Sequence, residues 1–300
     1  MNGLAPRLQA LVAEVRKAGL ESLRSSLSDE LTSTQIEADV ARSIYDRYHA
    51  RWFRDPQFRV TARDAALEEQ LTAATPHQLT ATEGDLVSMA EDHTRIALEG
   101  VLVRVPPAVP VQRTDGGAMR LRIPAIRPVL SPGFLLVDGS SGRPDGSAVA
   151  RFYVRLSAPG QAVQVWKEAL SSLEALTVRY RAKVASSAGM FPRADAMVVY
   201  CSAAAEAVVR DGLRETLEGR LEAGAMPSVF TEEIAPGLEF AEEPLENPGG
   251  ELSFGQHRSR ALAQGLIKGA REGWADAERT VADALRRHDI APSQPWRNIR

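Results

Sequence analysis

Residues 149–157 read VARFYVRLS, and this stretch decides the fold class of the second half of the chain. Apolar side chains alternate here with basic or aromatic ones at a period of two, which is the period of a β-strand. Arg151, Tyr153 and Arg155 therefore share one face of the predicted strand. The other face carries Phe152, Val154 and Leu156. The pattern predicts that one face lies in the core and the other faces a functional site.

The segments that follow alternate between helix and strand patterns. Trp166 and several leucines mark the buried side of the first helix, and Gly224 is the predicted stop of the second. This order predicts an α+β fold, a mixed domain with a mainly antiparallel sheet flanked by helices. In sequence, the predicted elements are a helix over 158–176, strands over 177–186 and 191–203, and helices over 204–224, 255–272 and 274–288.

The first third of the chain has a different pattern. Apolar residues recur at helical spacing, which predicts a helical region over residues 1–98 that ends in a helix over 83–100. Two strand-like runs, VLVRV and MRLRIP, come next, and residues 127–148 form a turn-rich connection. We therefore expect two parts, with the α+β domain over residues 99–300.

The composition is that of a soluble globular chain. Of the 300 residues, 44% are hydrophobic and 25% are charged, and the formal net charge is -3. A general attraction to nucleic acid or to an anionic membrane is therefore not expected, and any anion site must be local. The sequence contains neither an apolar run near the roughly 20 residues of a membrane span nor a signal-peptide core, which predicts a cytoplasmic protein. A single cysteine and five scattered histidines lack metal-ligand spacing, so we predict no bound metal.

Basic residues in the second half occupy places where simple solvation is a poor explanation. The planar guanidinium group suits phosphate, and the start of a helix adds unpaired N–H groups, so these residues are candidates to converge on a dianion. They are Arg151, Arg155, Lys183, Arg193, Arg258 and Arg260.

Some of the candidate site residues can also have a purely structural role. Arg260 can pair with a carboxylate of the preceding acidic loop, such as Glu242 or Glu243. Tyr153 and Tyr200 can be packed aromatics with a satisfied hydroxyl.

Other features have similar alternatives. His257, an exposed residue of a first helical turn, is either a helix-start contact or a proton-transfer group. The glutamate-rich run at 231–244 is expected to be a solvated turn, and the glycine-rich run at 138–147 a flexible loop. Cys201 follows an apolar strand, which favours a buried thiol over a nucleophile.

Three motifs in a fixed order resemble a known family. RADAMVVY at 193–200, VFTEEIAPGLEFAEEP at 229–244 and SFGQHRSRALAQGL at 253–266 look like the C-terminal region of the Hop-type type III effector family of plant-pathogenic bacteria. The resemblance covers roughly residue 150 to the C-terminus. Members also occur in actinobacterial pathways for class V lanthipeptides and thioamitide peptides, where they are assigned as the lyase that works beside a separate kinase.

A more distant likeness to the effector phosphothreonine lyases of enteric bacteria implies roles for single residues. Those lyases have a Lys-Phe-His strand, a lysine base, an arginine-bearing strand and a C-terminal arginine pair. The chain departs from them at Tyr153, where the proposed general acid of the lyases is a histidine. Here the same order reads Arg-Phe-Tyr at 151–153, Lys183, Arg193 with Tyr200, and Arg258 with Arg260.

Elimination of phosphate needs a base for the Cα proton beside a cationic pocket for the departing dianion. The resemblance implies Lys183 as the base, and Tyr153 or His257 as the group that protonates the leaving oxygen. A lysine among guanidinium groups suits the task because neighbouring positive charge favours the neutral amine. The implied phosphate-binding residues are Arg151, Arg155, Arg193, Tyr200, Arg258 and Arg260.

The leading hypothesis is a phosphoserine/phosphothreonine lyase that converts phosphorylated residues of a ribosomal precursor peptide into dehydroalanine and dehydrobutyrine. The implied partners are the leader and core of that peptide and a dedicated Ser/Thr kinase, with the helical N-terminal region as the docking surface. No cofactor is implied. The alternatives are a non-catalytic protein that binds a phosphopeptide or scaffolds the kinase, and a secreted effector that acts on a host protein.

Overall fold

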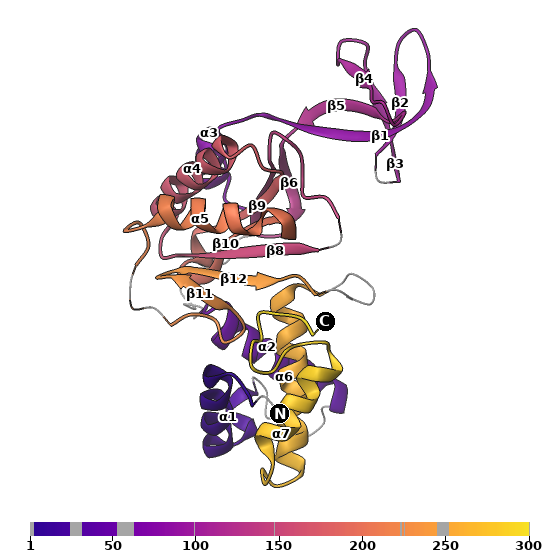
Figure 1. Ribbon diagram of the computed structural model, residues 1–300. Coiled ribbons are helices and arrows are strands. Elements are labelled where there is room, and N and C mark those ends of the chain that lie inside the picture. The colour runs from indigo at the N-terminus through magenta and orange to yellow at the C-terminus, as the bar shows by residue number, and fades with distance from the viewer. Residues whose placement is uncertain are drawn as a thin grey trace.

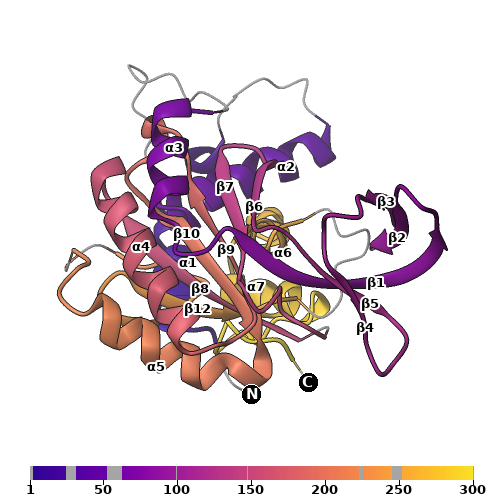
Figure 2. The same cartoon turned by 90° about the horizontal axis from the view of Figure 1, so that it is seen from above.

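A computed structural model gives the structure of the protein, and Figures 1 and 2 show it from two sides. The chain forms two antiparallel sheets and two layers of helices. The predicted α+β fold class is confirmed. The described residues are 3–24, 32–52, 63–98, 100–146, 148–222, 224, 226–244 and 252–299.

The described residues form seven α-helices, four shorter helical turns and twelve strands. The α-helices are α1 (Pro6–Ala18), α2 (Ser33–Ile44), α3 (Ala65–Ala74), α4 (Pro159–Ala175), α5 (Glu206–Leu217), α6 (Phe254–Arg271) and α7 (Ala277–Arg287). Shorter turns are η1 (Leu20–Leu23), the π-helical η2 (Tyr45–His49), η3 (Ala188–Met190) and η4 (Ala203–Ala205). The strands are β1 (Leu79–Met89), β2 (Thr94–Leu98), β3 (Val101–Val105), β4 (Val111–Arg113), β5 (Met119–Pro124), β6 (Ile126–Ser131), β7 (Phe134–Asp138), β8 (Val149–Leu156), β9 (Tyr180–Ala185), β10 (Arg193–Ser202), β11 (Glu232–Ala235) and β12 (Leu238–Glu242).

The larger sheet has seven strands in the order β11-β12-β8-β10-β9-β7-β6. Helices α3, α4 and α5 cover one face, and α1, α2, α6 and α7 pack on the other (Figure 1). Each face has its own apolar core, because side chains along a strand alternate between the two sides. Phe152 and Trp166 lie in the core under α4, as predicted, while Tyr153 lies in the core under α6.

The smaller sheet has five strands in the order β3-β2-β1-β5-β4 and projects beyond the β6 edge of the larger one (Figures 1 and 2). The helix expected over residues 83–100 is wrong, because β1 and β2 occupy this segment. Strand β1 pairs with β5 from Leu79 opposite Pro124 to Gly84 opposite Met119, and these long-range ladders outweigh the helical spacing. The strands predicted from the sequences VLVRV and MRLRIP are confirmed as β3 and β5.

Two further expectations need correction. Residues 127–148, expected as a turn-rich connection, contain most of β6 and all of β7, which form an edge hairpin of the larger sheet. The helix predicted to stop at Gly224 ends at Leu217, because Gly219 takes a positive φ of 70° that ends the helical path.

The helices of the N-terminal third pack in two different places. Helices α1 and α2 share an apolar core with α6 and α7 at the other end of the sequence, whereas α3 packs with α4. The division between residues 1–98 and 99–300 stays a prediction. Within the described residues, no helix has the length and apolarity needed to cross a membrane.

Candidate functional site

The predicted residues of the central strands lie on the face of the seven-stranded sheet that α6 covers, which we call the α6 face. On β8 this face carries Arg151 and Tyr153. Val198 of β10 lies opposite Tyr153 on one side and Lys183 on the other. Because neighbouring strands are about 4.8 Å apart, the Cα atoms of Tyr153 and Lys183 are roughly 10 Å apart in one row across the sheet. The next row holds Tyr200 between Arg151 and Arg181.

Lys183 and Arg193 meet at one aromatic ring. The Lys183 Nζ is 4.6 Å from the centre of the Phe134 ring, and the Arg193 Cζ is 5.6 Å from the same centre. Arg193 also lies 5.1 Å from the ring of Trp52. No carboxylate of the described residues forms an ion pair with Lys183. The half-buried amine therefore lies beside a guanidinium group and has no carboxylate ion pair among the described residues.

Arg193 itself is paired. Its Nε and Nη2 donate to the two oxygens of Asp195 at 2.5 and 2.9 Å, and the Tyr45 hydroxyl donates to the same carboxylate at 2.8 Å. Burial by itself would raise the pKa of Asp195, but the Arg193 charge and these hydrogen bonds hold the pKa well below its usual range. An irregularity in β10 between Arg193 and Met197 brings this pair to the edge of the cluster.

His49 is a further member of the cluster. Its ring is buried and lies 5.4 Å from the ring of Tyr153 and 5.3 Å from that of Tyr45, and its Nδ1 is 2.8 Å from the Ser228 Oγ. Burial lowers the pKa of His49 to about 4, and Arg193, Arg151 and Lys183 act in the same direction against the opposing charge of Asp195. His49 is therefore neutral at physiological pH.

Tyr153 and Arg151 lie beside each other under α6. The Tyr153 hydroxyl is buried and has no hydrogen-bond partner of good geometry in the described part of the chain. Burial raises its pKa well above the usual range, while the neighbouring Arg151 charge opposes the shift. Arg151 is ion-paired with Glu243, and its Cζ lies 4.9 Å from the centre of the Tyr200 ring. Tyr153 and Tyr200 are packed aromatics, and Tyr153 keeps its proton at neutral pH.

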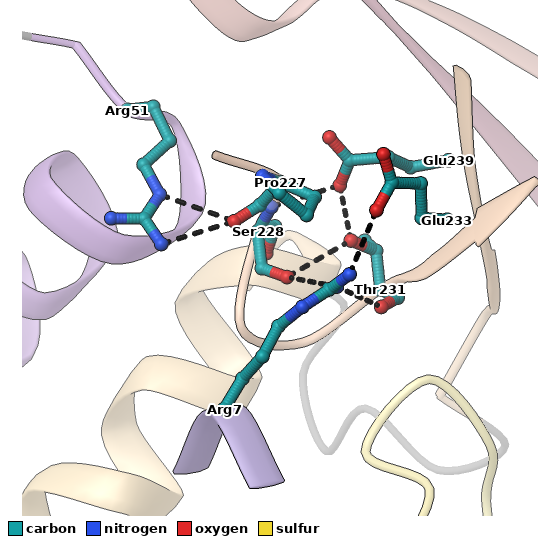
Figure 3. Close-up of polar contacts among 7 residues, drawn as sticks. All are labelled: Arg7, Arg51, Pro227, Ser228, Thr231, Glu233 and Glu239. Atoms are coloured by element: carbon teal, nitrogen blue, oxygen red, sulfur yellow. Dashed lines mark hydrogen bonds and ion pairs between the residues drawn. The ribbon is translucent and has the colours of Figure 1, made fainter. Parts of the chain in front are cut away.

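The loop over residues 227–231 lies beside His49 and strand β12, and Figure 3 shows it. Arg51 donates to the Pro227 carbonyl, and Arg7 donates to the Ser228 and Thr231 carbonyls and to Glu233. These contacts fix the loop against α1 and η2 (Figure 3).

A buried glutamate lies under this loop. Glu239 is opposite Tyr153 in the β12–β8 ladder and accepts hydrogen bonds from the Ser228 N–H and the Thr231 hydroxyl. Burial raises its pKa to about 7. The expectation that the glutamate-rich run is a solvated turn is wrong here, because the β11–β12 hairpin turns Glu239 inward. Arg155, on the same face, has a buried Nε with no hydrogen-bond partner among the described residues.

Arg258 lies at the start of α6 but is bound to the C-terminal segment. Its side chain is 0% exposed and donates to the Pro295 carbonyl at 3.1 Å, the Asn298 Oδ1 at 2.7 Å and the His257 Nδ1 at 2.9 Å. His257, expected to be exposed, is only 7% exposed because it packs between Arg258 and His288. Burial lowers the pKa of His257 to about 4.

Arg260 points away from this cluster. It pairs with Glu37 of α2 at 3.1 Å, so the expectation of a partner at Glu242 or Glu243 is wrong. Arg260 and Glu37 line a cavity of about 420 Å³ between α2 and α6, and Tyr45 lines it as well. Because the Tyr45 hydroxyl also contacts Asp195, this cavity adjoins the cluster on the α6 face.

The structure thus brings some of the predicted residues together and separates others. Lys183, Arg193, Tyr153 and Arg151 share the α6 face around His49, and Arg155 follows Tyr153 on β8. Arg260 lies on the outer side of α6. The roles proposed for these residues from the sequence stay predictions.

Sequence reasoning missed four residues of the cluster. Tyr45 and His49 belong to the π-helical turn η2, a local change of helix geometry that the amphipathic pattern of residues 36–53 does not reveal. Phe134 lies in a segment expected to be a loop. Asp195 alone had a usable signal, because it follows Arg193 by two residues in a predicted strand and therefore shares its face.

Comparison with known proteins places the chain in a family. A model of the HopA1 effector protein family matches residues 125–297, which is more than half of the chain. The chain belongs to the HopA1 effector protein family. The family match contains Phe134, Tyr153, Lys183 and Arg193 and begins directly after β5.

Two solved effector structures from Pseudomonas syringae have the same fold as this HopA1 family chain. The effector from pathovar tomato strain DC3000 is 12% identical with a TM-score of 0.52, and the similarity covers 97% of this chain and 98% of that one. The effector from pathovar syringae strain 61 is 14% identical with a TM-score of 0.53, and the similarity covers 100% of both chains. The fold likeness therefore includes the N-terminal part that lies outside the family match.

No curated protein matches this HopA1 family chain. Among the described residues, no group of three or more His, Cys, Asp or Glu side chains is placed to hold a metal ion.

Proposed function

We propose that this HopA1 family protein is a phosphoserine/phosphothreonine lyase, which eliminates phosphate from a phosphorylated precursor peptide to leave dehydroalanine or dehydrobutyrine. The observation that carries the proposal is the pair of cations at Phe134. Lys183 is an amine without a carboxylate partner in the described structure, and Arg193 lies against the same ring. A base beside a cationic group is what phosphate elimination requires.

The chemical step uses Lys183 as the base. Its neutral amine takes the Cα proton of the phosphorylated residue, and the electron pair of the broken C–H bond forms the Cα–Cβ double bond. The Cβ–O bond breaks, and its electrons leave with the phosphate. Tyr153, in the same row of the sheet, holds a hydroxyl proton that can be given to the departing oxygen. The buried, neutral His49 packs against Tyr153 and keeps that ring in place.

The phosphate would be held by the guanidinium groups of the α6 face. Arg155 has a free buried Nε among the described residues, and Arg193 is held in a fixed orientation by Asp195. Fixed donors stabilise developing charge without reorganisation at the moment of reaction. Arg151 would turn from Glu243 toward a phosphate that enters beside Tyr200.

Arg258 and Arg260 contribute less directly in this proposal. The guanidinium N–H groups of Arg258 already donate to the C-terminal segment. Arg258 would therefore act on Tyr153 only through its positive charge. Arg260 would meet substrate only at the cavity between α2 and α6. His257, whose Nδ1 accepts a hydrogen bond from Arg258, is replaced by Tyr153 as the proton donor.

The proposed partners follow from the reaction. The peptide must be phosphorylated first, so a separate Ser/Thr kinase has to supply the substrate, and we propose that it forms a complex with this protein in the cytoplasm. Helices α1 and α2 are the proposed docking surface for the kinase or for the leader of the peptide. The reaction needs no nucleotide and no redox cofactor.

The deciding experiment is incubation of the purified protein with a synthetic phosphorylated precursor peptide and no nucleotide, followed by mass spectrometry. We expect loss of phosphoric acid with the wild-type protein. Lys183→Ala should abolish this loss while phosphopeptide binding persists. Lys167→Ala, which removes an exposed lysine of α4, is the matched control and should eliminate phosphate at the wild-type rate.

Two results would count against the proposal. A wild-type protein that binds the phosphopeptide at every pH tested without a change of mass would be a binding or scaffolding protein. Elimination by Lys183→Ala at the wild-type rate would show that another group is the base.

A secreted effector that acts on a host protein is the second candidate. It is favoured by the fold likeness, which covers nearly all of two Pseudomonas syringae effectors. The two candidates differ in substrate: elimination from phosphorylated host proteins, with none from a phosphorylated precursor peptide, would favour the effector.

A further inference from the structure

A cavity of about 810 Å³ lies between the two sheets, and Lys183 is not among its lining residues. One side is formed by β1, β2, β3 and β5 of the projecting sheet, and the other by β6, β7 and β9 at the edge of the larger sheet. Figure 2 shows the projecting sheet extending past β6. The lining residues are of two kinds, gathered in different strands.

The projecting sheet gives the cavity an apolar wall. Leu98, Val103 and Ile123 are partly buried there, while Val101 is 63% exposed. Across the cavity Leu130 of β6 is 60% exposed. Exposed aliphatic side chains that face one cavity from two sheets are typical of a surface that a partner covers.

The β6–β9 side of the cavity is cationic. Arg127, Arg143 and Arg181 line it, and Asp138 is the one carboxylate among the described lining residues. Arg181 donates to both Asp138 oxygens at 2.6 and 3.1 Å, and the Nε of Arg127 is 3.5 Å from one of them. One buried carboxylate thus serves the two guanidinium groups of Arg127 and Arg181. The excess positive charge favours an acidic occupant.

Backbone groups add a third element of recognition. Strand β6 is the last strand of the larger sheet and pairs only with β7 among the described strands. Its residues Ile126, Arg127, Pro128 and Leu130 all line the cavity, so its outer edge borders the same space. The free edge of β6 offers C=O groups, and N–H groups except at Pro128, to an extended chain, and a lipid or a small anion would leave these groups unused.

We propose that this cavity binds an extended peptide segment in which apolar and acidic residues alternate. The segment adds to the free edge of β6 as a further strand. Its apolar side chains contact Val101 and Leu130, and its carboxylates meet Arg127 and Arg181. The proposal does not depend on the chemical step proposed above. Arg181 and Lys183 are two residues apart on the same face of β9, so a peptide bound at Arg181 would lie close to the Lys183 amine.

The test is fluorescence anisotropy with the full chain and a fluorescein-labelled decapeptide of alternating valine and glutamate. We expect saturable binding, and binding at least roughly tenfold weaker for a decapeptide of alternating valine and lysine. N-methylation of every second backbone nitrogen in the valine–glutamate peptide should also weaken binding roughly tenfold, because it removes the donors that pair with β6.

Variants locate the site. Val101→Glu and Arg127→Gln should each weaken binding roughly tenfold. Their matched controls are Val87→Glu and Arg95→Gln, which change exposed residues of the same projecting sheet that do not line the cavity. Circular dichroism spectra equal to the wild type would show that a loss of binding is not a loss of fold.

Four outcomes would overturn the proposal: no binding of the valine–glutamate peptide, equal binding of the lysine peptide, equal binding of the N-methylated peptide, and equal loss in the control variants. Sedimentation of the unliganded protein gives a fifth. A wild-type dimer that Val101→Glu converts to a monomer would assign this face to a second copy of the chain. None of these results depends on whether Lys183 eliminates phosphate.

Discussion

At the scale of single residues, a glycine allows the cluster on the α6 face to form. Gly255 lies in the first turn of α6, and an added Cβ would overlap the ring of His49 and approach Tyr45. The absence of a side chain therefore lets α6 lie directly on the π-helical turn. Ser253 caps the same helix, with its hydroxyl accepting from the Gln256 N–H and the Gln256 side chain accepting from the Ser253 N–H.

Gly255→Ala should destabilise the protein by about 2 kcal/mol, because the extra methyl group forces the His49 ring or the helix to move. Chemical denaturation would measure the change. Gly160→Ala is the control, since an added Cβ there meets no atom within 4 Å and an alanine in α4 should be neutral or slightly stabilising. Equal stability of both variants would show that α6 does not rest on His49.

Single residues of the site could be predicted only where the alternation of a strand revealed which face they share. The period-two alternation of β8 placed Arg151, Tyr153 and Arg155 on one face, which the structure confirms. The sequence could not show that His49, more than a hundred residues earlier, packs on Tyr153, because that contact depends on a π-helical turn and on long-range packing. For the same reason the sequence could not show that the Arg258 guanidinium donates to Asn298 of the C-terminal segment.

At the scale of elements, the β11–β12 hairpin carries a buried glutamate that links stability to pH. The pKa of Glu239 is raised from 4.5 to about 7 by burial, so the folded protein keeps a proton that the unfolded chain has lost. The stability from this proton is fully present below about pH 4.5 and is lost as the pH rises through about 7.

Glu239→Gln should remove this dependence, since glutamine is neutral at every pH and its Oε1 can still accept from the Ser228 N–H. The difference in free energy of unfolding between variant and wild type should shift in favour of the variant by on the order of 3 kcal/mol between pH 4.5 and 7. Glu233→Gln, at a more exposed position of β11, is the control for the loss of a carboxylate from the same hairpin. A difference for Glu239→Gln that stays constant between pH 4.5 and 7 would contradict the raised pKa.

Elements were predicted well where local pattern and long-range pairing agree. Helices α4, α6 and α7 and strands β8, β9 and β10 follow their sequence patterns. The prediction failed at β1 and β2, where helical spacing gave way to pairing with β5 and β3. It failed again at β6, where turn residues such as Pro128 hid an edge strand.

At the scale of the whole molecule, the two ends of the sequence meet under the seven-stranded sheet. The Ala5 N–H donates to the Pro292 carbonyl at 2.9 Å, and Arg258 binds Pro295 and Asn298. The Asn298 side chain in turn donates to the Glu243 carbonyl. The C-terminal segment is thus part of the support behind Arg151, whose partner is Glu243.

Arg258→Leu should cost about 3 kcal/mol of stability, because buried acceptors at Pro295 and Asn298 lose their donor. Hydrogen exchange should become faster at the amides of residues 297–299. Arg260→Leu breaks only the exposed pair with Glu37 and should cost less than about 1 kcal/mol. If Arg258→Leu weakens phosphopeptide binding without faster exchange in this segment, Arg258 contacts phosphate directly.

The projecting sheet has a small apolar core of its own, made of Ile96, Val105, Met119 and Leu121, separate from the two cores of the larger sheet. The match to the HopA1 effector protein family begins at residue 125, where this sheet ends. Substitutions in the projecting sheet can therefore accumulate without disturbing the packing around Lys183. Because its core is separate, this arm can open locally while the larger sheet stays folded.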